Sequence, residues 1–433
     1  MKKLKSTLID KVSSFKQEPL FMKHIRIKAL KSFNSLNMPN FGPKLNIDFD
    51  KINYFHRVDD QVNDWEKMNS GLKQPFEELG LLKAEKDYLG GIGVQYESTS
   101  IYHNMLSYLE EKGVIFVDTD TALKKYPELF KKYFSKLIPI GDNKFSDLNT
   151  AFWSGGAFIY VPKGVKLDRP LQSYFWINNQ NFGQFERTII IVDEGAELEY
   201  IEGCTARKES AGSLHAGVVE IFVHKNAKCR YTTIQNWSTN IYNLVTKRAL
   251  VEEDGLMEWI DGNIGSKITM KYPACILKGK NARGLCLSIS LADKDQIQDA
   301  GAKMIHLGPN TKSKIVSKSI ARNGGNATYR GTVHISKEAV NSMSTVKCDT
   351  FILDSLSKSD TFPTNIVSNK SSLLEHEATV SKISEDELFY LMSRGIDEEK
   401  AKELIILGFI EEFKSELPLE YAVELNNLLK NKY

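Results

Sequence analysis

The stretches Val192-Asp193-Glu194-Gly195-Ala196 and Val223-His224-Lys225-Asn226-Ala227 decide the fold, because they are two copies of one pattern. In each copy an apolar strand end meets a short polar turn that contains Gly or Asn, and another strand-like run follows. The same pattern stands at residues 161–165, 251–255, 277–282 and 307–311, so that successive turns fall about 26 to 31 residues apart. A unit that recurs at this period predicts a solenoid.

A solenoid made of strands and turns is a parallel β-helix, which we expect here to be right-handed and to make the protein mainly β. Each coil buries one face of its strands and leaves backbone groups for the next coil to pair, so stacking satisfies both needs. We expect this core at residues 151–380. A β-sandwich with regular turns is the alternative that the pattern leaves open.

Helical parts are predicted on both sides of the core. Residues 1–150 form a mixed, mostly helical domain, with helices after Pro19 and at residues 100–112 and 120–136. Residues 381–433 form a C-terminal helical domain.

Three helices are predicted in that C-terminal domain. Ser384 and Glu387 make a capping box at the start of the first. Asp397 caps a second helix that runs to Leu407, and a third is predicted at residues 418–429.

Composition and charge exclude several classes of protein. The 433 residues carry 57 basic and 55 acidic side chains, a net charge of +2, which argues against a dedicated nucleic-acid binder. No apolar run approaches the roughly 20 residues of a membrane span, and we expect neither a membrane protein nor a secretory signal. The five cysteines are odd in number and widely spread, which predicts reduced thiols in a cytosol-like compartment. A phosphate-binding loop, a G-x-S-x-G elbow, an H-E-x-x-H pair and a CxxC pair are absent, so several familiar enzyme signatures are missing.

Two of the five cysteines have polar surroundings in the sequence. Cys204 follows Glu202-Gly203 at a strand end, where we expect an accessible thiol whose thiolate Arg207 and Lys208 would favour. For this residue a functional and a structural interpretation are evenly balanced. Cys229, Cys275 and Cys286 are expected to be buried structural residues.

Cys348 is the stronger functional candidate, because the run Glu375-His376-Glu377 follows it. In a strand, Glu375 and Glu377 point to one face and His376 to the other, so all three meet one metal only if the strand bends. Thiolate, imidazole and carboxylate together suit iron, and the thiolate suits a cluster best. A solvated polar strand with a satisfied histidine is the alternative.

Long, specific runs of this sequence resemble the SufB family of iron–sulfur cluster assembly scaffolds. Examples are Thr232-Thr233-Ile234-Gln235-Asn236-Trp237 and Asp261-Gly262-Asn263-Ile264-Gly265. The likeness covers nearly the whole chain, and its other runs stand at residues 141–145, 153–156, 200–206, 214–216, 270–273, 298–306, 329–331, 376–379 and 416–422.

The resemblance implies a scaffold and not an enzyme. Such a protein forms a complex with the ABC-type ATPase SufC, which hydrolyses ATP, and with the paralogue SufD or a second SufB copy. It receives sulfur from a cysteine desulfurase and its sulfur carrier and builds a transient iron–sulfur cluster of the 4Fe-4S type. Reduced FAD is a further cofactor in some members. The implied location is the cytoplasm, or the plastid stroma in a plastid-bearing organism, without nucleic acid or membrane partners.

Roles for particular residues follow from the matching motifs. Cys204 would be the sulfur entry point and Cys348 the main cluster-building thiolate, with His376 and Glu377 beside it and Glu375 as a weaker member. The path between the two thiols would be lined by Gln235, Trp237, Lys247 and Asn178.

The implied mechanism is a persulfide relay. Sulfur would move from Cys204 to Cys348 inside the β-helix, and closure of two SufC subunits on the C-terminal helices would expose Cys348.

The chain departs from the family pattern at two places. Trp176 stands where relatives are expected to carry an arginine, so that cation is missing from the sulfur path. No cysteine precedes Cys204, so no accessory N-terminal cluster is expected. Two rival functions stay open at this point: a purely structural adaptor for SufC, and a carbohydrate-acting β-helix enzyme.

Overall fold

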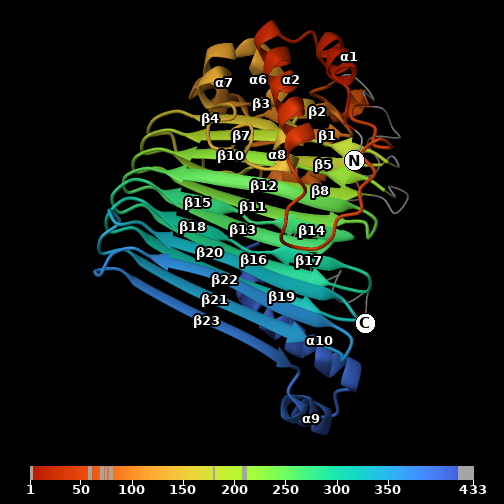
Figure 1. The fold of residues 1–433 in the computed structure, drawn as a ribbon, viewed down its shortest axis with the longest axis vertical. Helices are drawn as coiled ribbons and strands as arrows, with labels where there is room; N and C mark the ends of the chain where they lie inside the picture. Colours follow the sequence, from red (N-terminus) through yellow and green to blue (C-terminus); the bar gives the residue numbers. More distant parts are fainter. Residues whose placement is uncertain are drawn as a thin grey trace.

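The computed structural model describes residues 3–56, 61–68, 73, 76–77, 81–178, 181–206 and 212–417. Figure 1 shows a tall parallel β-solenoid whose coils stack from the N-terminal to the C-terminal end, with helices at both ends. The mainly β prediction is therefore confirmed, and the parallel pairing of successive coils excludes the sandwich alternative. No helix among the described residues has the length and apolar character needed to cross a membrane.

Two long sheets form the walls of the solenoid. The first, of ten strands, has the order β2 (Thr99–Met105), β1 (Gly91–Tyr96), β5 (Leu171–Ile177), β8 (Glu197–Ala206), β11 (Lys228–Trp237), β13 (Leu256–Gly265), β16 (Arg283–Ala292), β19 (Lys312–Ala321), β21 (Met343–Ile352) and β23 (Leu373–Lys382). The second comprises β3 (Ile115–Asp118), β4 (Ala157–Val161), β6 (Gly183–Gln184), β7 (Arg187–Val192), β9 (Leu214–His215), β10 (Val218–Val223), β12 (Tyr242–Val251), β14 (Ile268–Lys271), β15 (Ala274–Leu277), β17 (Ile297–Ala300), β18 (Lys303–His306), β20 (Asn326–Ile335) and β22 (Lys358–Val367).

The repeated turns stack on one another as the sequence predicts. Gly195, Asn226 and Asp254 all adopt positive φ (68°, 57° and 55°), a conformation that Gly, Asn and Asp tolerate best. Each donates its backbone N–H to the turn of the next coil, at 2.9 Å in all three cases. The turn residues therefore supply both the bend of each coil and its hydrogen bond to the next.

Alternate strand residues fill the interior, and the C-terminal helices cover part of one outer wall. α10 (Glu398–Phe409) and α11 (Glu411–Lys414) pack Ile406 and Phe413 against outward-facing residues of the ten-stranded sheet, such as Ile260 and Ile289. The preceding helix, α9 (Glu385–Ser393), has no buried residue.

The helix caps of this region agree with the sequence. Ser384 accepts a hydrogen bond from the Glu387 N–H (3.3 Å), and Asp397 accepts one from the Lys400 N–H (2.9 Å). The second helix ends at Phe409, two residues later than predicted. The helix predicted at residues 418–429 lies outside the described residues.

The N-terminal part contains more strand than predicted. Its helical segments are α1 (Thr7–Lys16), α2 (Leu20–Ser35), η1 (Trp65–Lys67), α4 (Leu81–Asp87), α5 (Ser107–Glu111), α6 (Thr119–Lys125), α7 (Pro127–Tyr133) and α8 (Lys144–Phe152). Residues 100–105, the first part of the helix predicted at 100–112, belong to strand β2, because they pair antiparallel with β1 and extend the first sheet. The helix predicted at 120–136 is interrupted at Tyr126 by Pro127, which begins a new helix. The sheets thus reach back into residues 1–150.

Candidate functional site

Cys204 lies inside the solenoid and not on its surface. It belongs to β8, is 1% exposed, and packs with Phe175 and Trp237. The prediction of an accessible thiol is wrong, because the strand continues through Ala206 and its alternation turns Tyr200, Glu202 and Cys204 to the same inner face. Arg207 and Lys208 lie outside the described residues.

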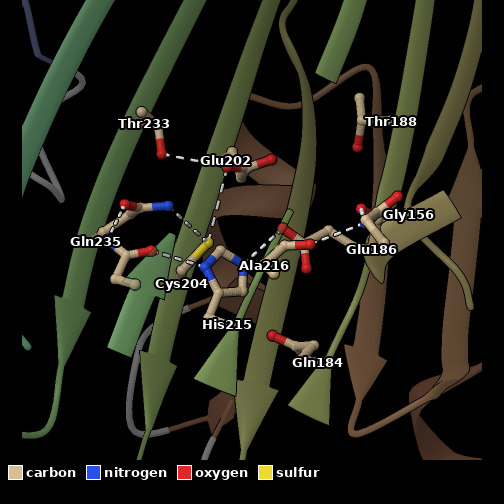
Figure 2. A network of polar contacts seen from close by, with 12 residues as sticks. Gly156, Gln184, Glu186, Thr188, Glu202, Cys204, His215, Ala216, Thr233 and Gln235 are labelled. Carbon is tan, nitrogen blue, oxygen red and sulfur yellow. Dashed lines mark hydrogen bonds and ion pairs between the residues drawn. The ribbon is translucent and has the colours of Figure 1, made fainter. Parts of the chain in front are cut away.

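Polar side chains surround the Cys204 thiol (Figure 2). Its sulfur lies 3.8 Å from Glu202 Oε1 and 4.0 Å from Gln235 Nε2. Glu202 also accepts hydrogen bonds from the hydroxyls of Thr233 (3.3 Å) and Tyr231. These residues come from β8 and β11, which are neighbours in the ten-stranded sheet.

Two fully buried lysines reach the same space from the opposite wall. Lys247 Nζ lies 3.7 Å from Glu202 Oε1 and 3.6 Å from Asp261 Oδ1, and it has no hydrogen-bond partner within the described part of the chain. Lys271 Nζ lies 2.9 Å from Asp261 Oδ2. Burial lowers the pKa of Lys271 to about 8, although Asp261 opposes the shift. Burial alone would raise the pKa of Asp261, but Lys271 and Lys247 outweigh it and lower that pKa.

A chain of hydrogen bonds connects this centre to the far side of the interior. Gln235 Oε1 accepts from Lys271 Nζ (2.9 Å) and from Asn243 Nδ2 (2.8 Å). Asn243 Oδ1 lies 2.8 Å from His215 Nδ1, and His215 Nε2 lies 2.5 Å from Glu186 Oε1. Figure 2 shows His215 between Cys204 and Glu186. The interior around Cys204 is therefore a connected polar network with buried charges of both signs.

This environment keeps the Cys204 thiol protonated at neutral pH. Burial, followed by the carboxylates of Glu202 and Glu186, raises the pKa of Cys204 well above its ordinary value of 9.0, and the cations of Lys247 and Lys271 only partly oppose the rise. A protonated thiol is not a nucleophile, so the site is inert as it stands.

The other residues expected along a sulfur path take different positions. Trp237 packs its ring 4.6 Å from the His215 ring. Asn178 follows β5, and its backbone N–H donates to Glu97 Oε1 at 2.9 Å. Trp176 points to the opposite face of β5 from Phe175 and packs against Phe76, so its side chain does not face Cys204. Gln235, Trp237 and Lys247 are thus the path residues that gather around the thiol.

Cys348 lies at the other end of the solenoid, on β21, and is 3% exposed. Its sulfur lies 3.4 Å from His376 Nε2, and Asn365 Nδ2 lies 3.1 Å from His376 Nδ1. Because an amide nitrogen can only donate, His376 accepts at Nδ1 and donates its Nε2 proton to the Cys348 sulfur. Burial raises the pKa of Cys348 to about 12, and Tyr329 opposes part of that rise. Burial also lowers the pKa of His376, which keeps the imidazole neutral.

The two glutamates beside His376 do not join it. Glu375 and Glu377 are exposed while His376 is half-buried, as the alternation of a strand requires. Within the described part of the chain, no group of three His, Cys, Asp or Glu side chains is arranged to hold a metal ion. Cys348 and His376 are therefore together, and the carboxylates face away from them.

A column of polar residues on the inner face of the ten-stranded sheet runs from Glu202, next to Cys204, to Cys348. Successive neighbours in register from β8 to β21 are Glu202, Thr233, Asp261, Ser288, Ser317 and Cys348, all buried. Ser288 and Ser317 are hydrogen bonded through their hydroxyls (3.1 Å). Five strand spacings of about 4.8 Å make the column roughly 24 Å long.

Several members of this interior were missed from the sequence, namely Glu186, Glu202, Asp261, Lys271, His215, Asn243, Ser288 and Ser317. The sequence contains a pattern that could have identified some of them. Glu202 and Cys204 occupy alternate positions of one strand, and so do Asp261 and Asn263, at places where an inward-facing residue is normally apolar. Cys229, Cys275 and Cys286 are buried as predicted, and all five cysteines are free thiols.

A parallel β-solenoid with a thiol at each end of a buried polar column defines the structural class, and sequence comparisons define the family. A family model described as "SUF system FeS cluster assembly, SufBD core domain" matches residues 175–409. A second, "SufBD protein N-terminal region", matches residues 97–173. The chain is 57% identical over 429 residues to an iron–sulfur cluster assembly SufBD family protein of Staphylococcus saprophyticus, covering 99% of this chain and 92% of the relative.

Other relatives give the same result. A SufBD family protein of Staphylococcus epidermidis is 57% identical and one of Staphylococcus haemolyticus is 56% identical, each with 99% of this chain and 92% of the relative covered. The chain therefore belongs to the SufBD family, which supports a role in iron–sulfur cluster assembly.

Proposed function

We propose that this chain is a SufB-type scaffold that accepts sulfur at Cys204 and builds a nascent iron–sulfur cluster at Cys348. The observation that carries the proposal is the continuous polar column from Glu202 to Cys348 on the inner face of the ten-stranded sheet. Burying so many polar groups costs free energy that an apolar interior would not, and such groups are common where chemistry needs them.

The cluster site is completed by a second protein in this proposal. Cys348 supplies a thiolate and His376 an imidazole, a donor set that suits iron. Thiolate formation is assisted by the His376 Nε2 proton, which points at the sulfur. Glu375 and Glu377 are candidates only if the last strand rearranges, because they now face outward.

The last coil is the surface for that second protein. Among the described residues β22 pairs with β20 and β23 with β21, and no further strand of that part of the chain adds to either, so each sheet ends there in an open edge. Large apolar side chains are exposed there, among them Ile366 (47%), Leu373 (49%) and Val380 (54%). Such an edge invites another strand to add to it. The partner is a SufD paralogue or a second copy of this chain.

The C-terminal helices are the proposed docking surface for a SufC-type ATPase. α9 exposes Phe389 (73%) and Tyr390 (57%), while α10 and α11 are fixed to the solenoid wall. In this proposal, a movement of α9 caused by the ATPase is transmitted through α10 and α11 to the ten-stranded sheet that carries Cys348. Sulfur arrives from a cysteine desulfurase and its carrier as a persulfide, and Cys204 receives it only after its cover of apolar residues opens.

A reduced flavin is a further proposed ligand. A cavity of about 300 Å³ lies between residues 36–41 and the outer side of β12, with the rings of Phe41 and Tyr272, the Lys303 cation and the Arg248–Asp142 ion pair in its wall. These residues fit an aromatic ring system and an anionic group. A flavin bound there would supply electrons. Flavin fluorescence titration should show weaker binding for Tyr272→Leu, and equal binding would refute this site.

Iron and acid-labile sulfide in the complex test the proposed function. The chain is co-purified with its ATPase without oxygen and compared with Cys348→Ser, and Cys275→Ser serves as a buried-thiol control. We expect iron, sulfide and a visible cluster band in wild type and control, and none in Cys348→Ser. No iron in wild type, despite an intact complex and a working sulfur donor, would favour the structural adaptor. Family membership already disfavours a carbohydrate-acting enzyme.

A further inference from the structure

Cys204 needs a base before it can accept sulfur. Its thiol is buried and its pKa is raised, so almost no thiolate exists at neutral pH. In the closed state bulk water does not reach a residue that is 1% exposed, and the Glu202 carboxylate beside the sulfur is the nearest acceptor for the proton. The thiol donates toward Glu202 Oε1 at 3.8 Å. This requirement rests on the proposed sulfur entry at Cys204.

Proton transfer from Cys204 to Glu202 avoids the electrostatic cost of holding two negative charges close together in a buried site. A thiolate next to a carboxylate would place two anions side by side in a buried site, which is why Glu202 helps to raise the pKa of Cys204. When the proton moves from sulfur to Glu202, the pair keeps a single negative charge. Thr233 and Lys247 lie 3.3 and 3.7 Å from the same carboxylate oxygen and fix its position.

A second side chain, Gln235, is positioned to stabilise the negative charge that forms on the Cys204 sulfur. Lys271 can only donate, so the oxygen of the Gln235 amide must face Lys271 and Asn243. This fixes the Gln235 Nε2 group toward the Cys204 sulfur at 4.0 Å. Lys271 is therefore a positioning residue that acts through Gln235. A donor held in place before the reaction stabilises a developing sulfur anion without further rearrangement.

We propose that Glu202 is the general base that deprotonates Cys204 for sulfur transfer. The Cys204 proton moves to Glu202, and the thiolate attacks the terminal sulfur of a protein persulfide on the donor. A new S–S bond forms on Cys204 and the S–S bond of the donor breaks. The donor leaves as a thiolate, which takes the proton from Glu202. One thiol and one persulfide are consumed and one of each is produced, so no oxidant or reductant is needed.

The charged groups that face Cys204 come from both walls of the solenoid. They are Glu202, Glu186, Lys247 and Lys271, with His215 between Cys204 and Glu186. Among them Glu202 is the carboxylate in contact with the sulfur, whereas Glu186 is bound to His215.

The test measures single-turnover transfer of ³⁵S from a persulfide-bearing donor to Cys204 in the complete complex, from pH 6.5 to 9.5. Glu202→Gln removes the base and keeps the shape of the side chain. Glu202→Asp keeps a carboxylate. Glu199→Gln is the matched control, because Glu199 is on the same strand and faces outward. Cys204→Ala establishes where the label enters.

Glu202→Gln should slow transfer by about 10² to 10⁴-fold at pH 7, because a lost general base costs that much. Its rate should then rise about tenfold per pH unit, whereas the wild-type rate changes little over the same range. Glu202→Asp should recover part of the rate, and Glu199→Gln should match wild type. A merely structural role would lower the melting temperature without changing the pH slope.

Two results would overturn the inference in distinguishable ways. Wild-type rate and pH profile in Glu202→Gln would reject Glu202 as the base while leaving Cys204 as the entry point. Unchanged labelling of Cys204→Ala would reject the proposed entry point itself. If Glu202→Gln does not fold, Glu202→Asp is the deciding variant, because it displaces the carboxylate. A wild-type transfer rate and pH profile in Glu202→Asp would reject Glu202 as the base. A reduced rate with a steeper pH dependence would support it.

Discussion

The coils around Cys204 and the last coil around His376 treat polar groups in opposite ways. Near Cys204 the side chains of Glu202, Lys247 and Asp261 are at most 3% exposed and pair with one another. In the last coil, β22 and β23 are mostly exposed, and no other strand in the described part of the chain pairs with their outer edges. The Cys204 region is therefore closed and its charges are paired, whereas the last coil is open.

This difference supports the two roles proposed for the thiols, sulfur acceptance at Cys204 and cluster assembly at Cys348. Both have raised pKa values, but Cys204 is enclosed by charged partners from its own chain, whereas Cys348 interacts with Tyr329 and with the half-buried His376 on the terminal strand. A sealed site suits a step in which sulfur must be kept from solvent. An open end suits the assembly of a cluster with ligands from two proteins.

The largest predicted effect concerns the sealed interior. Lys271→Met leaves Asp261 buried with only Lys247, 3.6 Å away, as a cation. We expect a loss of about 3–5 kcal/mol in the free energy of unfolding, the usual cost of breaking a buried pair. Lys347→Met, at a half-exposed lysine on the outside of β21, should change it by less than about 0.5 kcal/mol. Urea unfolding monitored by circular dichroism measures both.

A double variant sharpens that result. Lys271→Met with Asp261→Asn should be more stable than Lys271→Met alone, because the unpaired charge is gone. If the single variant is as stable as wild type, the interior charges are not paired in the way described.

The buried thiols should make the solenoid less stable at alkaline pH. The pKa values of Cys275 and Cys348 are both raised to about 12, so the folded chain holds protons that the unfolded chain releases near pH 9. Their stabilisation is complete below pH 9 and is lost as the pH rises toward 12. Buried lysines such as Lys271, whose pKa is lowered to about 8, have the opposite effect between pH 8 and pH 10, so the thiol contribution is measured as the difference between wild type and Cys275→Ala. From pH 9 to pH 10 the urea midpoint of wild type should fall more, or rise less, than that of Cys275→Ala, and identical pH profiles would contradict the account.

The smallest effect on stability belongs to the open end. Val380→Lys on β23 should change the unfolding free energy of the isolated chain by less than about 0.5 kcal/mol, since Val380 is 54% exposed. The same change should prevent association with the partner subunit, because it places a charge on the docking edge. Size-exclusion chromatography with light scattering measures the association, and Lys382→Ala on the same strand is the control. An unaffected complex would place the interface elsewhere.

The sequence predicted the solenoid because its coils are specified locally. Turn residues such as Asn226 and Asp254 have the conformation that their residue types favour, and their spacing gives the period. Strand β2 was missed, since its conformation depends on pairing with β1 and not on its own pattern.

The site was predictable in part. Gln235, Trp237 and Lys247 were named from motifs and do surround Cys204, whereas its burial and its contact with Glu202 depend on how far β8 continues past the thiol. The ion pair of Lys271 with Asp261 joins strands of opposite walls, and no residue spacing in the sequence predicts such a contact. Long-range contacts of this kind follow only from the stacking of coils.

The most direct measurement follows labelled sulfur from one thiol to the other. The complete complex receives ³⁵S from a persulfide-bearing donor in the presence of ATP but without iron, and the labelled peptides are identified by mass spectrometry. We predict label at Cys204 first and at Cys348 later, no label at Cys348 in Cys204→Ala, and label held at Cys204 in Cys348→Ala. Normal labelling of Cys348 in Cys204→Ala would contradict the account, because sulfur would then enter without crossing the sealed interior.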